Sequence, residues 1–298
     1  MLNFLLNSGG KDSNYSSILV NNNNIFIKID NFCENLLDKK YLFLNCIINK
    51  KKILIINLKN EYNFFFDFKN SKFIFYNLDF YCNKFIKINL VKQIIFKLNL
   101  LTGHYFRIQK NFFFVSIDQK KDQCYFLNFK KKIHSNIGFF NKLIITYITK
   151  KKNFVCKCKK STTGICFKIN KNFFFCNYYV FENKNIFETN YCKLFYNLGQ
   201  LYKKNFIVKI KYNQIIISKY NYLSKTKILI LKLNFNYSKI CKIKINSQNI
   251  FKNAKIIFNK KKCYLICYKF IYFIEKNQNC LIKYNELIIS NIIIKKKN

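Results

Sequence analysis

The chain begins with a short apolar run that ends in a glycine-rich loop. Leu2–Leu6 is followed by Asn7-Ser8-Gly9-Gly10, which predicts a strand and then a turn, and Asp12–Val20 is predicted to begin a helix. Ile25–Ile29 and Ile53–Asn57 predict two further strands. Strands that alternate with helices are typical of an α/β layer, so we expect a parallel sheet at the start of the chain.

The sequence pattern changes near residue 206. Short, closely spaced, β-branched runs follow, and they predict a small all-β sandwich or barrel. We find no internal repeat. The runs are Phe206–Ile210, Gln214–Ser218, Lys227–Leu233, Lys242–Ile245, Ala254–Phe258, Cys263–Tyr268 and Leu287–Ile294.

The composition of the 298 residues is skewed toward Lys, Asn, Ile, Phe and Tyr, with no Pro and no Trp. Residues encoded by GC-rich codons are nearly absent, which indicates drift in an AT-rich genome. The net charge of +41 favours a nucleic-acid or other polyanionic partner. Drift toward Lys is a competing cause of that charge.

The cysteines and the absence of targeting signals favour a reducing cytoplasm. Thirteen Cys, an odd count without a regular framework, do not indicate a secreted disulfide scaffold. The N-terminus shows no signal-peptide pattern. No apolar run approaches the length of a membrane span, so no membrane partner is expected.

Glycine is rare in this chain, which has six, so the position of each one is informative. Each is expected where a side chain cannot fit, or where a ligand approaches the backbone. Five of them fall in four compact words, SGGKDS, TGHY, TTGIC and LGQ, and the sixth is Gly138. Glycines retained at random positions would not cluster in this way.

The word SGGKDS (Ser8–Ser13) carries the first indication of chemistry. Between a strand and a helix it offers consecutive backbone N–H groups, a hydroxyl at each end and a helix N-terminus, which suit a pyrophosphate. It is not the G-x-x-x-x-G-K-[ST] phosphate loop. It resembles the PP-loop of the N-type ATP pyrophosphatases, which split ATP between the α- and β-phosphates. The plain alternative is a Gly-Gly turn with a capping Asp.

Further motifs follow along the chain. Each alone is weak evidence of function, since a lone Cys is more often a buried hydrophobic residue than a nucleophile. Together they resemble one family, the tRNA-specific 2-thiouridylases, which convert the wobble uridine of certain tRNAs to 2-thiouridine. The resemblance is dense over Ser8–Gln200 and thin after that. The words are NLDFYCN (Asn77–Asn83), LTGHYFRI (Leu101–Ile108), KDQCYFL (Lys121–Leu127), KKSTTGICF (Lys159–Phe167) and LFYNLGQ (Leu194–Gln200).

The resemblance implies an α/β fold with a Rossmann-like PP-loop catalytic domain over residues 1–170. A reduced central tRNA-binding segment would cover 171–205, and a C-terminal β-barrel would cover 206–298. It also implies ATP as the cofactor, with Mg²⁺ expected to neutralise its phosphates. tRNA and a sulfur-donor protein, a cysteine desulfurase or a relay, are the implied partners, and a monomer is expected.

Roles for individual residues also come from the resemblance. Cys82 would be a nucleophile, Cys166 would carry sulfur as a persulfide, and Asp79 would be a general acid/base. ATP would contact Leu6, Asn7, Ser8, Gly9, Gly10, Lys11, Asp12, Ser13, Ile27 and Gly103. The target base or the tRNA would contact Asn77, Leu78, Asp79, His104, Lys121, Asp122, Gln123 and Gln278.

The chemistry fits these residue types. Adenylation turns the poorly leaving C2 oxygen of uridine into one that departs with AMP. A persulfide on Cys166 can then attack C2, and Cys82 can attack the sulfur–sulfur bond, which leaves 2-thiouridine and a Cys82–Cys166 disulfide. Lysines would position phosphates without reading the sequence.

The chain departs from the family pattern at several points. Lys11 and Asn7 replace the usual Val and the usual small residue or Met, and Ser161 replaces an Asp beside Cys166. The NPD word has lost its Pro, and a glycine-rich loop that normally follows LGQ is replaced by Leu201–Asn205. The replaced loop is expected to loosen the closure of the site over its substrate.

Two rival functions remain open. A lysidine synthetase shares the SGGxDS word and adenylates a base but needs no cysteine pair. A degenerate RNA-binding protein would have had no reason to keep Asp12, Asp79, Cys82 and Cys166 together. Cys156 and Cys158 form a C-x-C word for which drift is a better explanation than a metal site, because no second Cys/His set has suitable spacing.

Overall fold

The chain forms two compact units in a computed structural model. The first unit comprises residues 1–65, 79–169 and 286–288, and the second comprises 66–78, 170–285 and 289–298. The described residues are 3–20, 23–28, 36–65, 78–95, 99–127, 133–159, 177–182, 185–191, 201–202, 204–210, 214–219, 225–231, 239–245, 250–259, 262–272 and 278–297.

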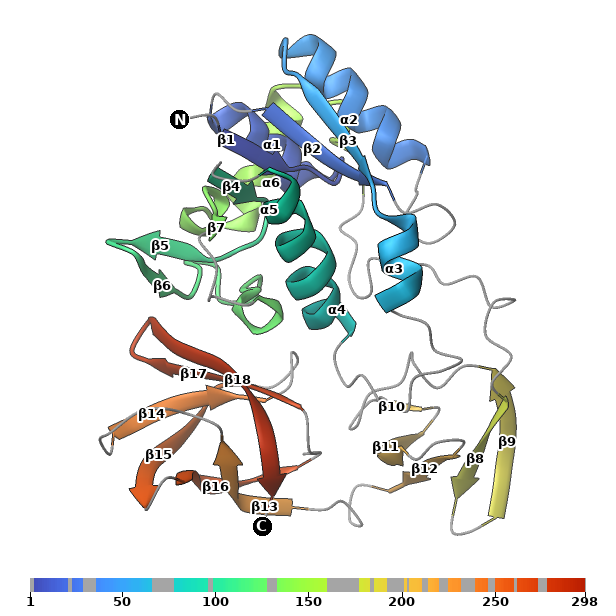
Figure 1. The fold of residues 1–298 in the computed structure, drawn as a ribbon, viewed down its shortest axis with the longest axis vertical. Helices are drawn as coiled ribbons and strands as arrows, with labels where there is room; N and C mark the ends of the chain where they lie inside the picture. The colour runs from blue at the N-terminus through green and yellow to red at the C-terminus, as the bar shows by residue number, and fades with distance from the viewer. Residues whose placement is uncertain are drawn as a thin grey trace. The chain divides into compact units, whose positions relative to one another are not determined.

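A parallel five-stranded sheet forms the centre of the first unit (Figure 1). Its order is β3-β2-β1-β4-β7, and every neighbouring pair is parallel. The expected strands at the start of the chain and the expected α/β class are confirmed. The strands are β1 (Asn3–Leu6), β2 (Asn23–Lys28), β3 (Ile53–Asn57), β4 (Asn99–Thr102) and β7 (Ile133–His134).

Helices connect β1, β2, β3 and β4, because a parallel pair cannot be joined by a tight hairpin, whereas the connection from β4 to β7 contains a short β-hairpin and a 3₁₀ turn. From α2, Leu42 and Cys46 pack on Phe26 of β2, while Tyr15 of α1 and Ile145 of α6 share a second buried cluster. The helical segments are α1 (Lys11–Leu19), α2 (Leu36–Ile48), α3 (Lys59–Phe65), α4 (Leu78–Tyr81), the π-helix η1 (Cys82–Leu90), α5 (Val91–Ile94), the 3₁₀ turns η2 (Cys124–Phe126) and η3 (Ile137–Phe139), and α6 (Lys142–Lys151).

The first unit also holds a short hairpin, β5 (Arg107–Gln109) and β6 (Phe112–Phe114). Lys110 and Asn111 make its two-residue turn with φ of 48° and 67°, the positive values that tight hairpins require. Arg107, the one arginine of the chain, donates to the Val115 carbonyl at 2.8 Å and pairs with Glu286 at 2.5 Å. These contacts hold the 286–288 segment on the hairpin.

The second unit contains a mixed sheet and a closed barrel. The mixed sheet has the order β10-β11-β12-β8-β9, in which only the described pair β12–β8 is parallel. Its strands are β8 (Asn177–Glu182), β9 (Asn185–Tyr191), β10 (Leu201–Tyr202), β11 (Asn205–Ile210) and β12 (Gln214–Ser218).

The barrel strands follow the order β13-β16-β15-β14-β17-β18, and β13 also pairs with β18, which closes the sheet. Small and branched side chains fill its core, among them Ala254, Leu265 and the thiols of Cys241 and Cys267. The strands are β13 (Lys225–Leu231), β14 (Lys239–Lys244), β15 (Lys252–Asn259), β16 (Lys262–Tyr272), β17 (Asn279–Tyr284) and β18 (Leu287–Lys297).

The expected C-terminal barrel is thus present, with a difference in its membership. The runs Phe206–Ile210 and Gln214–Ser218 do form strands, β11 and β12, but they pair with β8 and β10 in the mixed sheet. The barrel gains β17 instead, a strand that the sequence pattern did not single out. The domain bounds drawn from the resemblance stay predictions. Within the described ranges, no helix has both the length and the apolar character needed to cross a membrane.

Gly138 offers a test of the first unit's packing. A Cβ atom there would lie 1.8 Å from the carbonyl oxygen of Phe106, a backbone atom that cannot rotate away. We expect Gly138→Ala to lower the free energy of unfolding by about 1–3 kcal/mol, measured by urea denaturation. Gly10→Ala is the matched control, since its Cβ would meet nothing closer than 3.5 Å. Equal stability of both variants would contradict the packing described.

Candidate functional site

The site lies where the order of the sheet reverses direction. From β1 the chain proceeds to β2 and β3 on one side, and β4 and β7 lie on the other. In open α/β sheets, ligands bind beyond the carboxyl ends of the strands at such a switch point. Here β1 ends at Leu6 and β4 ends at Thr102, so SGGKDS and TGHY begin at neighbouring strand ends.

The SGGKDS loop has a conformation that depends on its glycines. Gly9 has φ of +74°, and a Cβ there would lie 2.0 Å from the carbonyl oxygen of Asp38. The Oγ atoms of Ser8 and Ser13 are 3.2 Å apart, and Ser13 Oγ donates to the Gly10 carbonyl at 3.1 Å. Gly103 packs against the same turn, because its Cβ would approach the Cα of Ser13 to 2.9 Å.

The first turn of α1 has no side-chain cap. Gly10 is the N-cap residue and supplies no side chain to accept from the first backbone N–H groups. The positive end of the helix dipole and these donors favour an anion. The loop therefore keeps the elements of an anion-binding site that its sequence predicted.

Four buried asparagines form a hydrogen-bond network with the backbone of the loop. Asn7 Nδ2 donates to Oδ1 of Asn14 and of Asn24, each at 3.0 Å, and Asn7 Oδ1 accepts from the Gly9 amide at 3.0 Å. Asn14 Nδ2 donates to the Gly9 carbonyl at 3.2 Å, and Asn45 Nδ2 donates to Asn14 Oδ1 at 3.3 Å. All four side chains are nearly inaccessible to solvent. We call Asn7, Asn14, Asn24 and Asn45 the asparagine cluster.

Asp12 is the charged centre of the loop. Its Oδ1 accepts from the hydroxyl of Tyr105 at 2.8 Å and pairs with Lys142 Nζ at 2.5 Å. Burial and the negative charge of Asp12 raise the pKa of Tyr105, so the phenol stays protonated and donates. The side chain of Lys142 is mostly buried at the start of α6, which places a cation beside the proposed phosphate loop.

TGHY and KDQ are joined by backbone and side-chain bonds. Tyr105 N donates to Gln123 Oε1 at 2.9 Å, and Gln123 N donates to the Tyr105 carbonyl at 3.0 Å. Asp122 accepts from the Ser116 amide and from both the amide and the thiol of Cys124. Asp122 and Gln123 therefore hold the local fold, and Lys121 is the member of the predicted KDQ trio that is exposed.

His104 lies against the end of β4. Its Nδ1 is 2.5 Å from Thr102 Oγ1, and its carbonyl accepts from Ser135 Oγ at 2.5 Å. Burial, and after it the positive charge of Lys87, lowers the pKa of His104 to about 3. The imidazole is therefore neutral at neutral pH, so a contact with tRNA would use hydrogen bonding and not charge.

Cys82 begins the π-helix η1, directly after α4. π-helical turns are rare and often occur at functional sites. The thiol of Cys82 is buried, with 1% of the residue exposed, and it is not part of a disulfide. Asn83, next to it, donates to the Phe126 carbonyl at 3.2 Å and so ties η1 to the end of KDQCYFL.

Several predicted residues cannot be placed at the site. Asn77, Ser161 and Cys166 lie outside the described residues, and for Leu78 and Asp79 only the backbone of α4 is described. The proximity of Cys82 to Cys166 is thus untested and stays a prediction. Gln278 is in the second unit with 4% of its surface exposed, and this burial counts against a direct tRNA contact.

The remaining predicted ATP contacts occupy the expected elements. Leu6 ends β1, Ile27 lies in β2 opposite Ile56 of β3, and Lys11 begins α1. Cys156 is buried and accepts from Asn14 Nδ2 at 3.4 Å, while Cys158 is exposed. Among the described side chains, no group of three His, Cys, Asp or Glu residues could hold a metal ion.

Three residues of the site were missed by the sequence analysis as candidates: Asn14, Tyr105 as a partner of Asp12, and Lys142. Lys142 is 130 positions from Asp12, so no local pattern connects them. Tyr105 was visible as the last letter of TGHY. Lys142 belongs to none of the motifs singled out in the sequence, so nothing local marked it as a site residue.

Comparisons with known proteins find similar sequences for part of the chain. A family model described as tRNA methyl transferase HUP domain matches residues 75–170. The tRNA-specific 2-thiouridylase MnmA of Mycoplasma genitalium is 32% identical over 196 residues, which cover 54% of this chain and 53% of that protein. The MnmA of Mycoplasma mobile is 34% identical over 143 residues, covering 42% of this chain and 39% of that protein.

The matched stretches thus span about half or less of those relatives. A solved structure, the U34-tRNA thiolase NcsA from Methanococcus maripaludis with its [4Fe-4S] cluster, has a TM-score of 0.35 and 12% identity over 55% of this chain and 60% of that chain. A TM-score this low supports no conclusion about function or cofactor. Over these stretches the chain is similar in sequence to the tRNA-specific 2-thiouridylases.

Proposed function

We propose that this protein thiolates tRNA, and that it uses ATP to activate the C2 oxygen of a wobble uridine for attack by sulfur. The observation that carries the proposal is the arrangement at the switch point, where an uncapped helix N-terminus, Asp12 and Lys142 meet at the SGGKDS loop. The similarity to 2-thiouridylases over about half of their length supports the choice of substrate.

In this proposal ATP binds with its phosphates on the SGGKDS loop. The backbone N–H groups of the first turn of α1, the hydroxyls of Ser8 and Ser13 and the ammonium of Lys142 would contact the phosphate oxygens. Ile27 and Gly103 would border the adenosine part. Mg²⁺ usually keeps several waters and is held by substrate phosphates together with one or two carboxylates. The single carboxylate of the SGGKDS loop, Asp12, fits this pattern.

The reaction then proceeds in two transfers. The C2 oxygen of uridine attacks the α-phosphate and releases pyrophosphate, with Asp79 as the proposed acid/base. The terminal sulfur of a Cys166 persulfide attacks C2 and displaces AMP, which forms a C2–S–S–Cys166 linkage. The Cys82 thiolate attacks the Cys166 sulfur of this bond, so 2-thiouridine leaves and a Cys82–Cys166 disulfide remains. A cellular thiol reductant must then restore both thiols.

The burial of Cys82 adds one requirement to this scheme. A thiolate can attack only when it reaches its target, and 1% exposure leaves the sulfur inaccessible. The start of η1 must therefore open when substrate binds. A sulfur-donor protein that loads Cys166, a monomeric enzyme and a reducing cytoplasm complete the proposal.

The two cysteines provide the first test of this function. We expect Cys82→Ser and Cys166→Ser each to abolish 2-thiouridine formation, because either step of sulfur transfer then lacks its sulfur. Nucleoside mass spectrometry of tRNA from thiolation-deficient cells that express each variant measures the outcome. Cys158→Ser, which removes an exposed thiol, is the control. Normal thiolation by either of the first two variants would rule out the two-cysteine mechanism.

Lys142 provides a second test, directed at the ATP step. We expect Lys142→Met to reduce tRNA-dependent pyrophosphate release about 10- to 100-fold, the range for the loss of a hydrogen bond to a charged group. Lys142→Arg should retain more activity, since it keeps the charge. Lys150→Met changes an exposed lysine of the same helix and should behave as wild type. Wild-type pyrophosphate release by Lys142→Met would show that this lysine only balances the charge of Asp12.

A further inference from the structure

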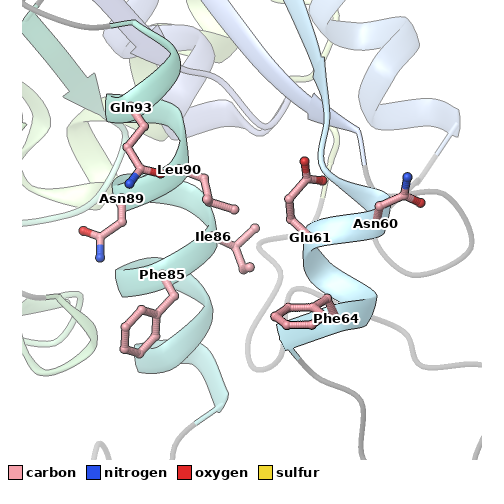
Figure 2. Close-up of a pocket in the computed structure, with 8 residues that line it drawn as sticks. All are labelled: Asn60, Glu61, Phe64, Phe85, Ile86, Asn89, Leu90 and Gln93. Atoms are coloured by element: carbon pink, nitrogen blue, oxygen red, sulfur yellow. The ribbon is translucent and has the colours of Figure 1, made fainter.

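A pocket outside the ATP loop lies between α3 and η1, with a volume of about 480 Å³ (Figure 2). Ile86 and Leu90 point from η1 toward α3, and the ring of Phe64 points back toward η1. Phe85 and Asn89 line the pocket from η1 and Gln93 from α5, and Asn60 and Glu61 complete the lining from α3. The volume is within the range of small-molecule sites.

The chemistry of the lining favours an uncharged, planar, polar-edged group. Three side-chain amides, Asn60, Asn89 and Gln93, each offer donors and an acceptor, and the rings of Phe64 and Phe85 offer stacking surfaces. None of the described lining residues is basic, and Glu61 is acidic, so an anion such as a phosphate is disfavoured. A nucleobase meets these conditions, because it stacks on aromatic rings and forms hydrogen bonds at its edges.

Two details of the lining suit a bound base. Asn89 lines the pocket, and its Oδ1 atom is buried and has no hydrogen-bond partner among the described residues; if the amide turns toward the pocket, this oxygen gains a partner in a ligand N–H. Phe64 leaves 88% of its surface exposed at the rim, so its ring is accessible for stacking.

Lys84 supplies the charge that the pocket lacks. Its ammonium lies 4.6 Å from the ring centre of Phe85 and 5.7 Å from that of Phe80. A base that stacks in the pocket would leave its phosphodiester outside, in reach of such a cation. Aromatic surface inside and a lysine at the edge are the two elements with which proteins hold single-stranded RNA.

We propose that this pocket binds the base of an RNA nucleotide that neighbours the target uridine. The location fits, because η1 begins at Cys82 and Ile86 follows one turn later on the same helix. This inference rests on the proposed function and adds a second base-binding site to it. A base held along η1 would also couple RNA binding to the helix whose start must move to expose Cys82.

The test is a double-mutant cycle between protein and RNA. An anticodon stem-loop containing the wobble uridine is compared with stem-loops in which one flanking nucleotide at a time is abasic. We expect Phe64→Ala and Asn89→Leu each to weaken binding of the intact stem-loop about 5- to 10-fold, measured by fluorescence anisotropy. For one abasic stem-loop, the same variants should bind as wild type does, because the stacking partner is already absent.

Phe112→Ala is the matched control, since Phe112 is another exposed phenylalanine of the same unit, 58% exposed on β6. It should bind every stem-loop as wild type does. Equal losses by Phe64→Ala on intact and all abasic stem-loops, or no loss on any, would overturn the inference. Thiolation of the intact stem-loop by the wild-type protein tests the proposed function separately, so each can fail without the other.

Discussion

The asparagine cluster is the interaction on which the proposed ATP site depends. A left-handed Gly9 and an uncapped α1 would leave a flexible turn if the amides of Asn7 and Asn14 did not bond to both the N–H and the carbonyl of Gly9. Buried amides that satisfy one another are rigid, because each unpaired donor or acceptor would cost about 1–3 kcal/mol. The cluster reaches β2 through Asn24 and α2 through Asn45, so three elements fix one loop. It also explains why Asn7, which departs from the family pattern, is tolerated.

Ion pairs flank the loop in a protein of net charge +41. Near the loop, Asp12 balances Lys142, and Lys159 pairs with Asp38 beside Gly9. The chain has thirteen acidic residues and 54 basic ones, so carboxylates that can pair with a lysine are few. In the proposed ATP complex, the phosphates would take over these lysines as partners, and the carboxylates would then face the metal or solvent. Lysines thus stand beside the loop while the loop retains the carboxylate of Asp12.

The sequence predicted local features well and long-range ones poorly, for physical reasons. β3 was predicted with its observed bounds because Ile53–Asn57 is an isolated apolar run, and SGGKDS was recognisable because few sequences can make that turn. β17 was missed because Asn279–Tyr284 has only three apolar residues beside polar ones, although all but the last residue are buried. The partner sheet of β11 and β12, and the Lys142–Asp12 pair, are set by tertiary packing between segments far apart in the chain. No window of sequence contains that information. The cysteine pair was inferred by family resemblance alone, and its geometry is still a prediction.

The pairing of β13 with β18 has a consequence for a chain so rich in isoleucine. An open sheet of such strands would present two rows of unpaired backbone groups flanked by apolar side chains, which is a template for intermolecular β-pairing. Closure pairs the backbone of Leu229–Leu231 in β13 with the backbone of β18 in the same molecule. A genome that drifts toward Ile raises the aggregation tendency of every strand it encodes. A barrel is one of the few folds in which that drift can proceed without creating an adhesive edge.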